Sequence, residues 1–192
     1  MIAIPTFHEV SASMYGAWRL ARLDRQGMVW FDRTIEGVTR SFWAAILCFP
    51  GFIALLALRV SPAEWMQSGA AHILLVESIS YVVGWAAFPL IALWLCARIG
   101  HEQGGLNFVA AYNWAQILET SLFVIVALIG SLHAVAEPAA EFLGLIALAL
   151  ALGYEWFIAR IAVGAGGIAA TALILIDLVL GAGLNRVTQD LY

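Results

Sequence analysis

The sequence predicts an all-α fold, a polytopic membrane helix bundle with five transmembrane helices and an N-terminal amphipathic helix at the membrane interface. Two observations lead to this prediction. The 192 residues are 63% hydrophobic and only 11% charged, whereas a soluble domain carries about 25% charged residues. The apolar residues also gather into runs of about 20, the length that crosses the hydrocarbon core of a bilayer. A surface this apolar would aggregate in water, which excludes a soluble enzyme, a disordered chain and a disulfide-stapled secreted module.

Five apolar runs, separated by short connections, are the predicted membrane spans. They are long and show little period-two alternation, so helices fit them better than the strands of a barrel do. We therefore expect an N-terminal amphipathic segment (residues 1–40), a five-helix transmembrane domain (41–184) and a short C-terminal tail (185–192). The five predicted spans are Ser41–Val60, Ala71–Arg98, Leu106–Leu132, Phe142–Val163 and Gly164–Leu184.

The N-terminal segment has the pattern of an amphipathic helix. Apolar residues from Val10 to Ala21 recur at helical spacing, while Arg19, Arg22 and Arg25 line another face. Such a helix can lie in the headgroup region of the inner leaflet, or it can pack on the cytoplasmic end of its own bundle. Both interpretations remain open at this stage. Asp32 is a candidate cap for a further helix that leads into the first span.

The arginines, which supply all nine basic residues, predict the orientation of the chain. With the N-terminus in the cytoplasm, the outer side receives only Arg59 and Arg186. Cytoplasmic connections carry an excess of basic residues, so we expect a bacterial inner-membrane protein with its N-terminus inside and its C-terminus outside. The arginines on the inner side are then Arg19, Arg22, Arg25, Arg33, Arg40, Arg98 and Arg160.

The connection after the first span predicts a short helix on the outer membrane surface. Ser61 and Glu64 have the spacing of a capping box, in which each side chain binds the backbone N–H of the other residue. Pro62 occupies the first helical position between them, where its missing N–H costs nothing.

Four acidic residues lie within the predicted spans, where a charge is costly and usually faces the interior of a bundle. At a rise of about 1.5 Å per residue, Glu77, Glu119 and Asp177 fall at a similar depth in the outer half of the bilayer. Glu155, the fourth, falls near the inner end beside Arg160. The common depth makes the first three acids the candidate functional cluster.

Polar neighbours extend this cluster along the third span. Asn113 and Gln116 share a helical face with Glu119. No basic residue lies at mid-depth, although Arg59 could reach inward from the outer end, so the acids are expected to be partly protonated. They can then act as an interhelical polar cluster through hydrogen bonds, or form an ion or proton pathway.

A metal site is a weaker candidate. His72 and His133 lie near the outer ends of the second and third spans, and two imidazoles with carboxylates could bind a transition metal. No recognised metal or haem motif supports this interpretation, and no cofactor is expected. Cys48 and Cys96 lie inside apolar runs and are interpreted as small buried side chains.

Two prolines and several small residues bear on how the spans pack. Pro50 and Pro89 fall inside the first two spans, where proline is expected to kink a helix. Small residues four positions apart permit close contact between helices, within the chain or between copies. These pairs are Ala147/Ala151, Ala149/Gly153 and Gly167/Thr171.

The layout resembles the Yip-type family of small five-span membrane proteins, which have a polar cytoplasmic N-terminus, closely spaced helices and an outward C-terminus. Eukaryotic members carry an Asp-Leu-Tyr-Gly-Pro stretch before the spans. Here the nearest segment is Ser13-Met14-Tyr15-Gly16-Ala17, which shares the Tyr-Gly pair. The resemblance implies a membrane-organising or partner-binding protein without catalysis, and it transfers no functional residues.

Two functions follow as hypotheses. The first is a non-enzymatic accessory or scaffolding component of a membrane complex, in contact with the lipid bilayer and with copies of itself or a larger assembly. The second is a small proton- or cation-coupled permease or channel subunit that uses the buried carboxylates. An acid-dependent membrane enzyme ranks below both, because the sequence carries no nucleophile-and-base motif. The net charge of −4 argues against a nucleic-acid partner.

Overall fold

A computed structural model describes residues 4–132 and 135–192. Within these ranges the chain forms eight α-helices, one short 3-10 helix and no strand, which confirms the all-α prediction. Five helical stretches of this described part are long and apolar enough to cross a membrane, as a multi-pass membrane protein requires. They are Ile35–Arg59, α5 (Ala70–Arg98), α6 (Glu102–Ser131), α7 (Glu137–Ala162) and α8 (Gly167–Gln189).

The ends of the first and last spans differ from the sequence-based boundaries. The first consists of α2 (Ile35–Ser41) and α3 (Trp43–Arg59), so the helix starts within the segment predicted to precede the membrane. Thr34 is its N-cap, because the Thr34 side chain accepts a hydrogen bond from the Gly37 N–H. Asp32 does not cap the helix, since it instead binds the N–H and hydroxyl of Thr34. At the other end of the chain, α8 takes in most of the predicted tail.

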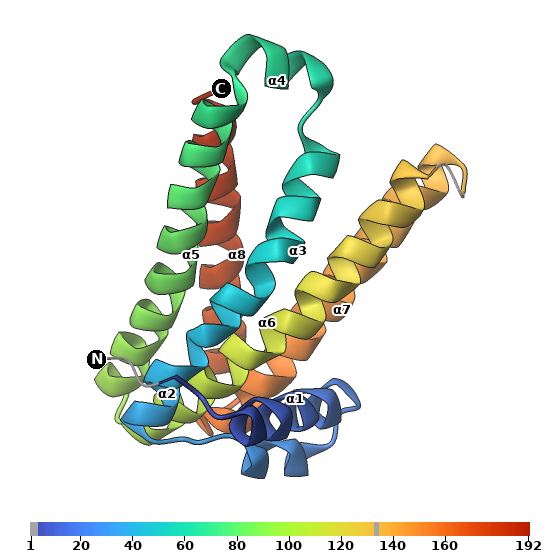
Figure 1. Ribbon diagram of the computed structural model, residues 1–192. Coiled ribbons are helices and arrows are strands. Elements are labelled where there is room, and N and C mark those ends of the chain that lie inside the picture. Colours follow the sequence, from blue (N-terminus) through green and yellow to red (C-terminus); the bar gives the residue numbers. More distant parts are fainter. Residues whose placement is uncertain (1–3, 133–134) are drawn as a thin grey trace.

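Helix α6 is the centre of the bundle. It packs against α1, α2, α3, α5 and α7, and α8 closes the assembly by packing on α5 and α7. Figure 1 shows α6 and α7 as a long hairpin that leans away from α3, α5 and α8. We call the end near α1 the α1 end, and the end near α4 and the C-terminus the α4 end. An uninterrupted run of α6, from Phe108 to Ala115, is buried.

Helix α1 (Phe7–Ala21) lies across the α1 end of the bundle rather than along it (Figure 1). Its buried face consists of Ser13, Gly16, Ala17 and Leu20. The Tyr154 hydroxyl of α7 donates a 2.8 Å hydrogen bond to the Ala17 carbonyl. Of the two interpretations of this helix, packing on its own bundle is therefore observed. The opposite face stays open, and Trp18 is 54% exposed there.

The 3-10 helix η1 (Arg25–Trp30) folds back onto α1. The crossing is tight, because a Cβ atom added at Gly16 would lie 2.9 Å from the Gly27 carbonyl oxygen. Glycine on both sides lets the two backbones meet. Met28 and Phe31 follow this crossing and are buried in the main hydrophobic core. The N-terminal segment is thus part of the folded structure.

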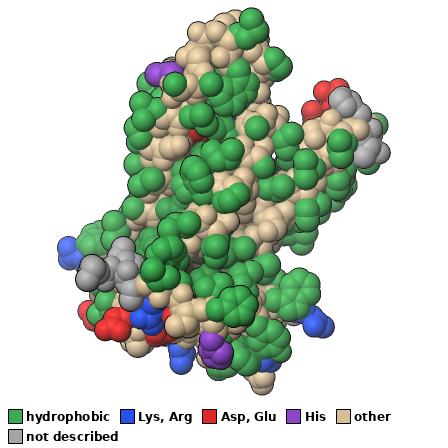
Figure 2. Space-filling view, viewed as in Figure 1, with side chains coloured by type: hydrophobic (Ala, Val, Ile, Leu, Met, Phe, Trp, Pro, Cys, Tyr) green, Lys and Arg blue, Asp and Glu red, His purple; other side chains and the backbone are tan. Residues whose placement is uncertain are grey.

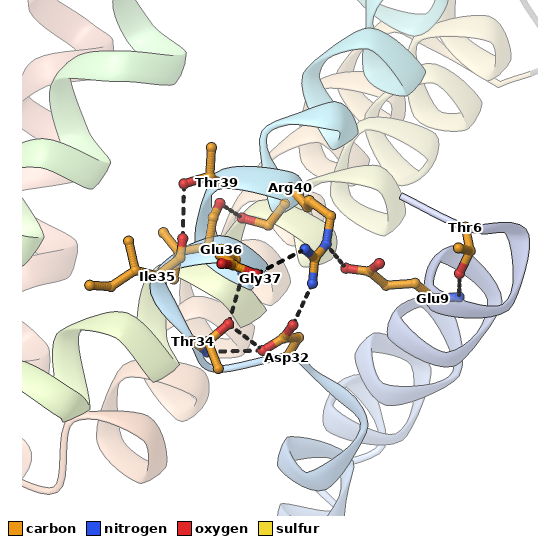
Figure 3. A network of polar contacts seen from close by, with 11 residues as sticks. Thr6, Glu9, Asp32, Thr34, Ile35, Glu36, Gly37, Thr39 and Arg40 are labelled. Atoms are coloured by element: carbon orange, nitrogen blue, oxygen red, sulfur yellow. Dashed lines mark hydrogen bonds and ion pairs between the residues drawn. The ribbon is translucent and has the colours of Figure 1, made fainter. Parts of the chain in front are cut away.

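Arg40 joins α1 to the start of the first span (Figure 3). Its guanidinium binds the Glu9 carboxylate at 2.8 Å and the Asp32 carboxylate at 2.5 Å. Although partial burial opposes the effect, hydrogen bonds from Thr34 and the positive charge of Arg40 hold the pKa of Asp32 below its usual range. The network fixes α1 relative to α2.

The α4 end is closed by a short helix, α4 (Pro62–Ser68), which connects α3 to α5. The predicted capping box is confirmed, since the Ser61 side chain accepts from the Glu64 N–H and Glu64 accepts from the Ser61 N–H. Hydrogen bonding to Ser61 holds the pKa of the Glu64 carboxyl group below its usual value, and the Ser61 side chain contributes more to this effect than the Ser61 backbone N–H does. The Ser68 hydroxyl donates to the Tyr192 carbonyl at 2.9 Å and fastens the end of the chain to α4.

Pro50 and Pro89 both lie inside continuous helices, α3 and α5. In the turn that precedes Pro50, the Ala45 carbonyl accepts a 2.6 Å hydrogen bond from the Tyr81 hydroxyl of α5. Pro89 is buried against the neighbouring helices. Pro89 therefore lies in a packed part of the bundle, whereas Pro50 is exposed on α3, where the nearby Ala45 carbonyl has its partner on another helix.

The surface has the distribution expected for a lipid-exposed protein. Figure 2 shows hydrophobic side chains over the length of the spanning helices, most of the charged side chains at the α1 end, and acidic side chains at the tip of the α6–α7 hairpin. Large apolar side chains such as Leu75, Val82, Leu150 and Val179 are more than half exposed. Lipid tails can cover such a surface, whereas water cannot cover it without cost.

Candidate functional site

Three carboxyl groups meet in the interior of the bundle, one from each of α6, α7 and α8. They belong to Glu119, Glu155 and Asp177, which we call the carboxyl triad. Glu155 lies in the middle, with its side chain within hydrogen-bonding reach of both Glu119 and Asp177. Glu119 and Glu155 are each 6% exposed. The triad thus brings together acidic side chains from three spanning helices.

Two neutral residues of α6 hold the triad in position. The Gln116 side-chain amide donates to Glu155 Oε1 at 3.1 Å. The Tyr112 hydroxyl donates to Asp177 Oδ2 at 2.8 Å. Tyr112, Gln116 and Glu119 are four and three residues apart, so they share one face of the helix. This face of α6 supplies both the donors and one of the acids.

Packing of α7 explains how Glu155 reaches the interior. The buried face of α7 runs through Ala147, Ala151, Glu155 and Ala159 at steps of four residues. Alanine at these positions allows α7 to approach α6 closely. Glu155 continues the same stripe and therefore points at α6 instead of at lipid.

The sequence predicts Glu155 near the inner end, beside Arg160 and outside the candidate cluster. In the structure it is the central member of the triad. No ion pair between Glu155 and Arg160 is found within the described residues. The Ala147/Ala151 pair, extended by one more step of four, is the sequence signal that could have identified it.

Glu77 is separate from the triad and has partners of its own. Its carboxylate, 4% exposed, forms an ion pair with Arg59 and accepts a hydrogen bond from the Tyr192 hydroxyl. Arg59 also donates to the Asn185 side chain at 2.6 Å. The possibility that Arg59 reaches inward from the outer end is therefore realised, because its long side chain extends from the end of α3 to Glu77.

A pocket of about 280 Å³, lined mostly by apolar side chains, has Glu77 and the triad residue Asp177 in its wall. It lies mainly between α5, α6 and α8, and we call it the α5–α8 pocket. Its lining runs from Glu77 and Thr188 near the α4 end to Gln116 and Asp177 in the middle of the bundle. The 11 residues between Asp177 and Thr188 on α8 correspond to about 16 Å of helix. Two of the three acids predicted as a cluster thus share one pocket.

The third predicted acid, Glu119, faces a second pocket of about 200 Å³ on the other side of the triad. Tyr154 of α7 and Ala21 at the end of α1 are among its lining residues, so we call it the α1-side pocket. Glu119 Oε1 is buried and has no hydrogen-bond partner within the described residues. The triad therefore stands between two pockets and contributes an acid to each.

Asn113, also predicted for the cluster, has a structural contact instead. Its side-chain amide donates to the Ser41 hydroxyl at 2.9 Å, and Ser41 in turn donates to the Val38 carbonyl. All three residues are buried at the contact between α2 and α6. Asn113 thus joins the first span to the central helix.

The histidine candidates do not form a metal site in the part of the chain that is described. No group of three or more histidine, cysteine and acidic residues suited to a metal is found in residues 4–132 and 135–192. His72 forms a 3.0 Å hydrogen bond with the Leu191 carbonyl. His133 lies outside the described residues. Cys48 and Cys96 are both buried free thiols.

Comparison of the chain with family models, with curated proteins and with solved structures finds no match. The resemblance to Yip-type proteins stays a prediction from topology.

Proposed function

We propose that the protein is a small proton- or cation-conducting membrane component, a permease or channel subunit, in which the carboxyl triad carries the charge. The observation behind this proposal is the position of the triad between two pockets, one of which leads to Glu77 and the other to α1. Acidic residues buried between spanning helices are typical of proton and ion pathways.

The chemistry of neighbouring carboxyl groups supports proton transfer. A carboxylate has only acceptor oxygens, so two carboxyl groups can hydrogen-bond to each other only through a proton that they share. Glu155 can share one proton with Glu119 or with Asp177. A proton can therefore pass from Glu119 through Glu155 to Asp177, or in the reverse direction, without leaving the interior of the bundle.

The α5–α8 pocket supports a small transported species. Its volume of about 280 Å³ is slightly below the roughly 300–1,000 Å³ found for ligand pockets. Ser80, Gln116 and Asn185 contribute polar groups to its wall besides the acids. Such a space suits protons, small cations and water rather than a large organic substrate.

The arginine distribution supplies the proposed direction. In the bacterial inner membrane, an excess of arginine at the α1 end would place that end in the cytoplasm. The α5–α8 pocket would then lead from the triad toward the outside, and the α1-side pocket would lie on the cytoplasmic side. Protons would pass between the two through Asp177, Glu155 and Glu119.

Flux in liposomes tests this proposal. The purified protein is reconstituted, a potassium diffusion potential is applied, and entry of protons is followed with an internal pH dye, with sodium and potassium flux measured in parallel. We expect Glu155→Gln to lower the flux at least tenfold, because an amide cannot release a proton. Glu141→Gln, at an exposed position of the same helix, is the matched control. Wild-type flux no greater than that of empty liposomes would exclude the function.

A second candidate is the accessory or scaffolding role, and an open face of α7 favours it. Ala149 and Gly153 are exposed, and a Cβ atom added at Gly153 would have no neighbour within 4 Å. Small residues at this spacing suit close packing with another spanning helix, here a second copy of the chain. We expect a defined oligomer in native mass spectrometry that Gly153→Leu breaks, whereas Gly183→Leu leaves it intact. A monomer at all protein concentrations would contradict this role.

A further inference from the structure

A basic pocket lies at the α1 end, away from the carboxyl triad. Its volume is about 380 Å³, and its lining residues are Arg25, Met28, Arg160, Ile161 and Gly164. It brings η1 together with the last turns of α7 and the turn that follows. Two arginines from distant parts of the sequence therefore face one small space.

Neither arginine has an acidic partner in the described part of the chain, whereas most other arginines do. Arg19, Arg40, Arg59 and Arg186 each form an ion pair. Two unpaired guanidinium groups in one pocket repel each other until an anion lies between them. The planar guanidinium group matches the geometry of phosphate oxygens and can donate two parallel hydrogen bonds to them.

The start of α8 adds positive potential to this place. The turn from α7 to α8 passes through Gly164 and Gly166, which adopt positive φ values of 72° and 95°. Helix α8 then begins at Gly167 without a side-chain cap. Arg160 Nε lies 3.9 Å from the position that a Gly167 Cβ would take, so its guanidinium is next to this helix start. Free N–H groups and the helix dipole favour an anion there.

The side chains around the basic pocket suit the boundary between lipid headgroups and acyl chains. Val29 of η1 is 69% exposed and Ile168 of α8 is 90% exposed. Both are large apolar side chains beside a charged pocket at the end of two spanning helices. Such side chains can enter the acyl region while the guanidinium groups stay at the level of the lipid phosphates.

We propose that Arg25 and Arg160 form a binding site for a phosphate-bearing anion, supplied either by the headgroup of an anionic phospholipid or by free phosphate. The two positive charges select a ligand with net negative charge. A phosphatidylcholine headgroup also contains a phosphate, but its choline cation would be repelled. The site therefore distinguishes phosphatidylglycerol from phosphatidylcholine.

Native mass spectrometry of the full chain tests the lipid arm. The protein is released from nanodiscs that contain equal amounts of phosphatidylglycerol and phosphatidylcholine, and the lipids that stay bound are counted. We expect the wild type to retain phosphatidylglycerol preferentially. Arg25→Gln with Arg160→Gln should weaken this preference about tenfold, because charge-assisted hydrogen bonds are lost. Arg33→Gln, an exposed arginine at the same end but outside the pocket, should leave it unchanged.

Inorganic phosphate in detergent tests the second arm. A rise in melting temperature with millimolar phosphate that depends on Arg25 and Arg160, without a lipid preference, assigns the site to free phosphate.

Labelling with phenylglyoxal requires no variant: phosphatidylglycerol or phosphate should protect Arg25 and Arg160 of the wild type but not Arg33. Equal labelling of all three arginines, with and without both anions, would overturn the proposal.

Discussion

At the residue scale, Glu77 and the carboxyl triad differ in the partners that their buried carboxyl groups have. Glu77 has a cation, Arg59, and a hydroxyl donor, Tyr192. The triad has amide and hydroxyl donors, and no ion pair to it occurs among the described residues. A carboxylate with an arginine partner keeps its negative charge, whereas carboxyl groups that face one another must share protons. This difference supports the proposal that protons move through the triad, and it favours a structural role for Glu77.

We expect Arg59→Met to destabilise the protein, because it leaves Glu77 buried without its cation. Removing one partner of a fully buried ion pair costs about 3–5 kcal/mol, and the partial exposure of Arg59 reduces the expected cost to about 2 kcal/mol. Thermal unfolding in detergent measures the change. The double variant Arg59→Met with Glu77→Gln should recover most of the loss. A double variant as unstable as the single one would show that the ion pair is not the cause.

The Asp32 network predicts a dependence of stability on pH. Because the pKa of Asp32 is lowered in the folded protein, its contribution is present above its unfolded pKa of about 3.9 and is lost as the pH falls through the lowered value. Asp32→Asn should therefore have a lower melting temperature than the wild type at pH 7. The gap should narrow as the pH falls below about 4. A gap that stays constant down to pH 3 would contradict this assignment.

At the scale of elements, the contact between α1 and η1 depends on glycine. A Cβ atom at Gly16 would lie within 3.0 Å of backbone and side-chain atoms of η1 and Phe31, so even alanine does not fit without movement. We expect Gly16→Ala to cost about 1–3 kcal/mol, as overpacking does, and to open the N-terminal segment to limited proteolysis. Gly144→Ala, where the added atom meets nothing within 4 Å, should be neutral or stabilising. Equal protease resistance of the two variants would exclude a tight crossing.

The elements themselves follow from the sequence, but the way they are aligned does not. Long apolar runs predict the spanning helices, because length and hydropathy alone decide which segments a bilayer accepts. Depths counted along single spans predict Glu155 away from Glu119, because each span is counted from its own end. In the structure Gly104 of α6 packs against the backbone of Val163 beyond α7, and further along the same pair of helices Gln116 lies beside Glu155. Such a contact between distant segments is not encoded in the periodicity of either one.

For the molecule as a whole, the uneven distribution of arginine and the two pockets together predict that the protein has one fixed orientation in the membrane. The α1 end carries the network around Arg40 and the pocket of Arg25 and Arg160, whereas the α4 end holds the polar residues near Glu77. Positive charge at one end directs that end to the cytoplasm during insertion. The triad would then connect an outward-leading pocket with a cytoplasmic one.

Labelling of single cysteines in intact cells tests this orientation. Because Cys48 and Cys96 are buried, an impermeant maleimide should report mainly on introduced cysteines. We expect Gln67→Cys, exposed on α4, to react from outside, and Ser11→Cys, exposed on α1, to react only after the membrane is opened. The reverse pattern would place the α5–α8 pocket on the cytoplasmic side and reverse the proposed proton path, while leaving the triad chemistry intact. Reaction of both positions from outside would contradict an odd number of spans.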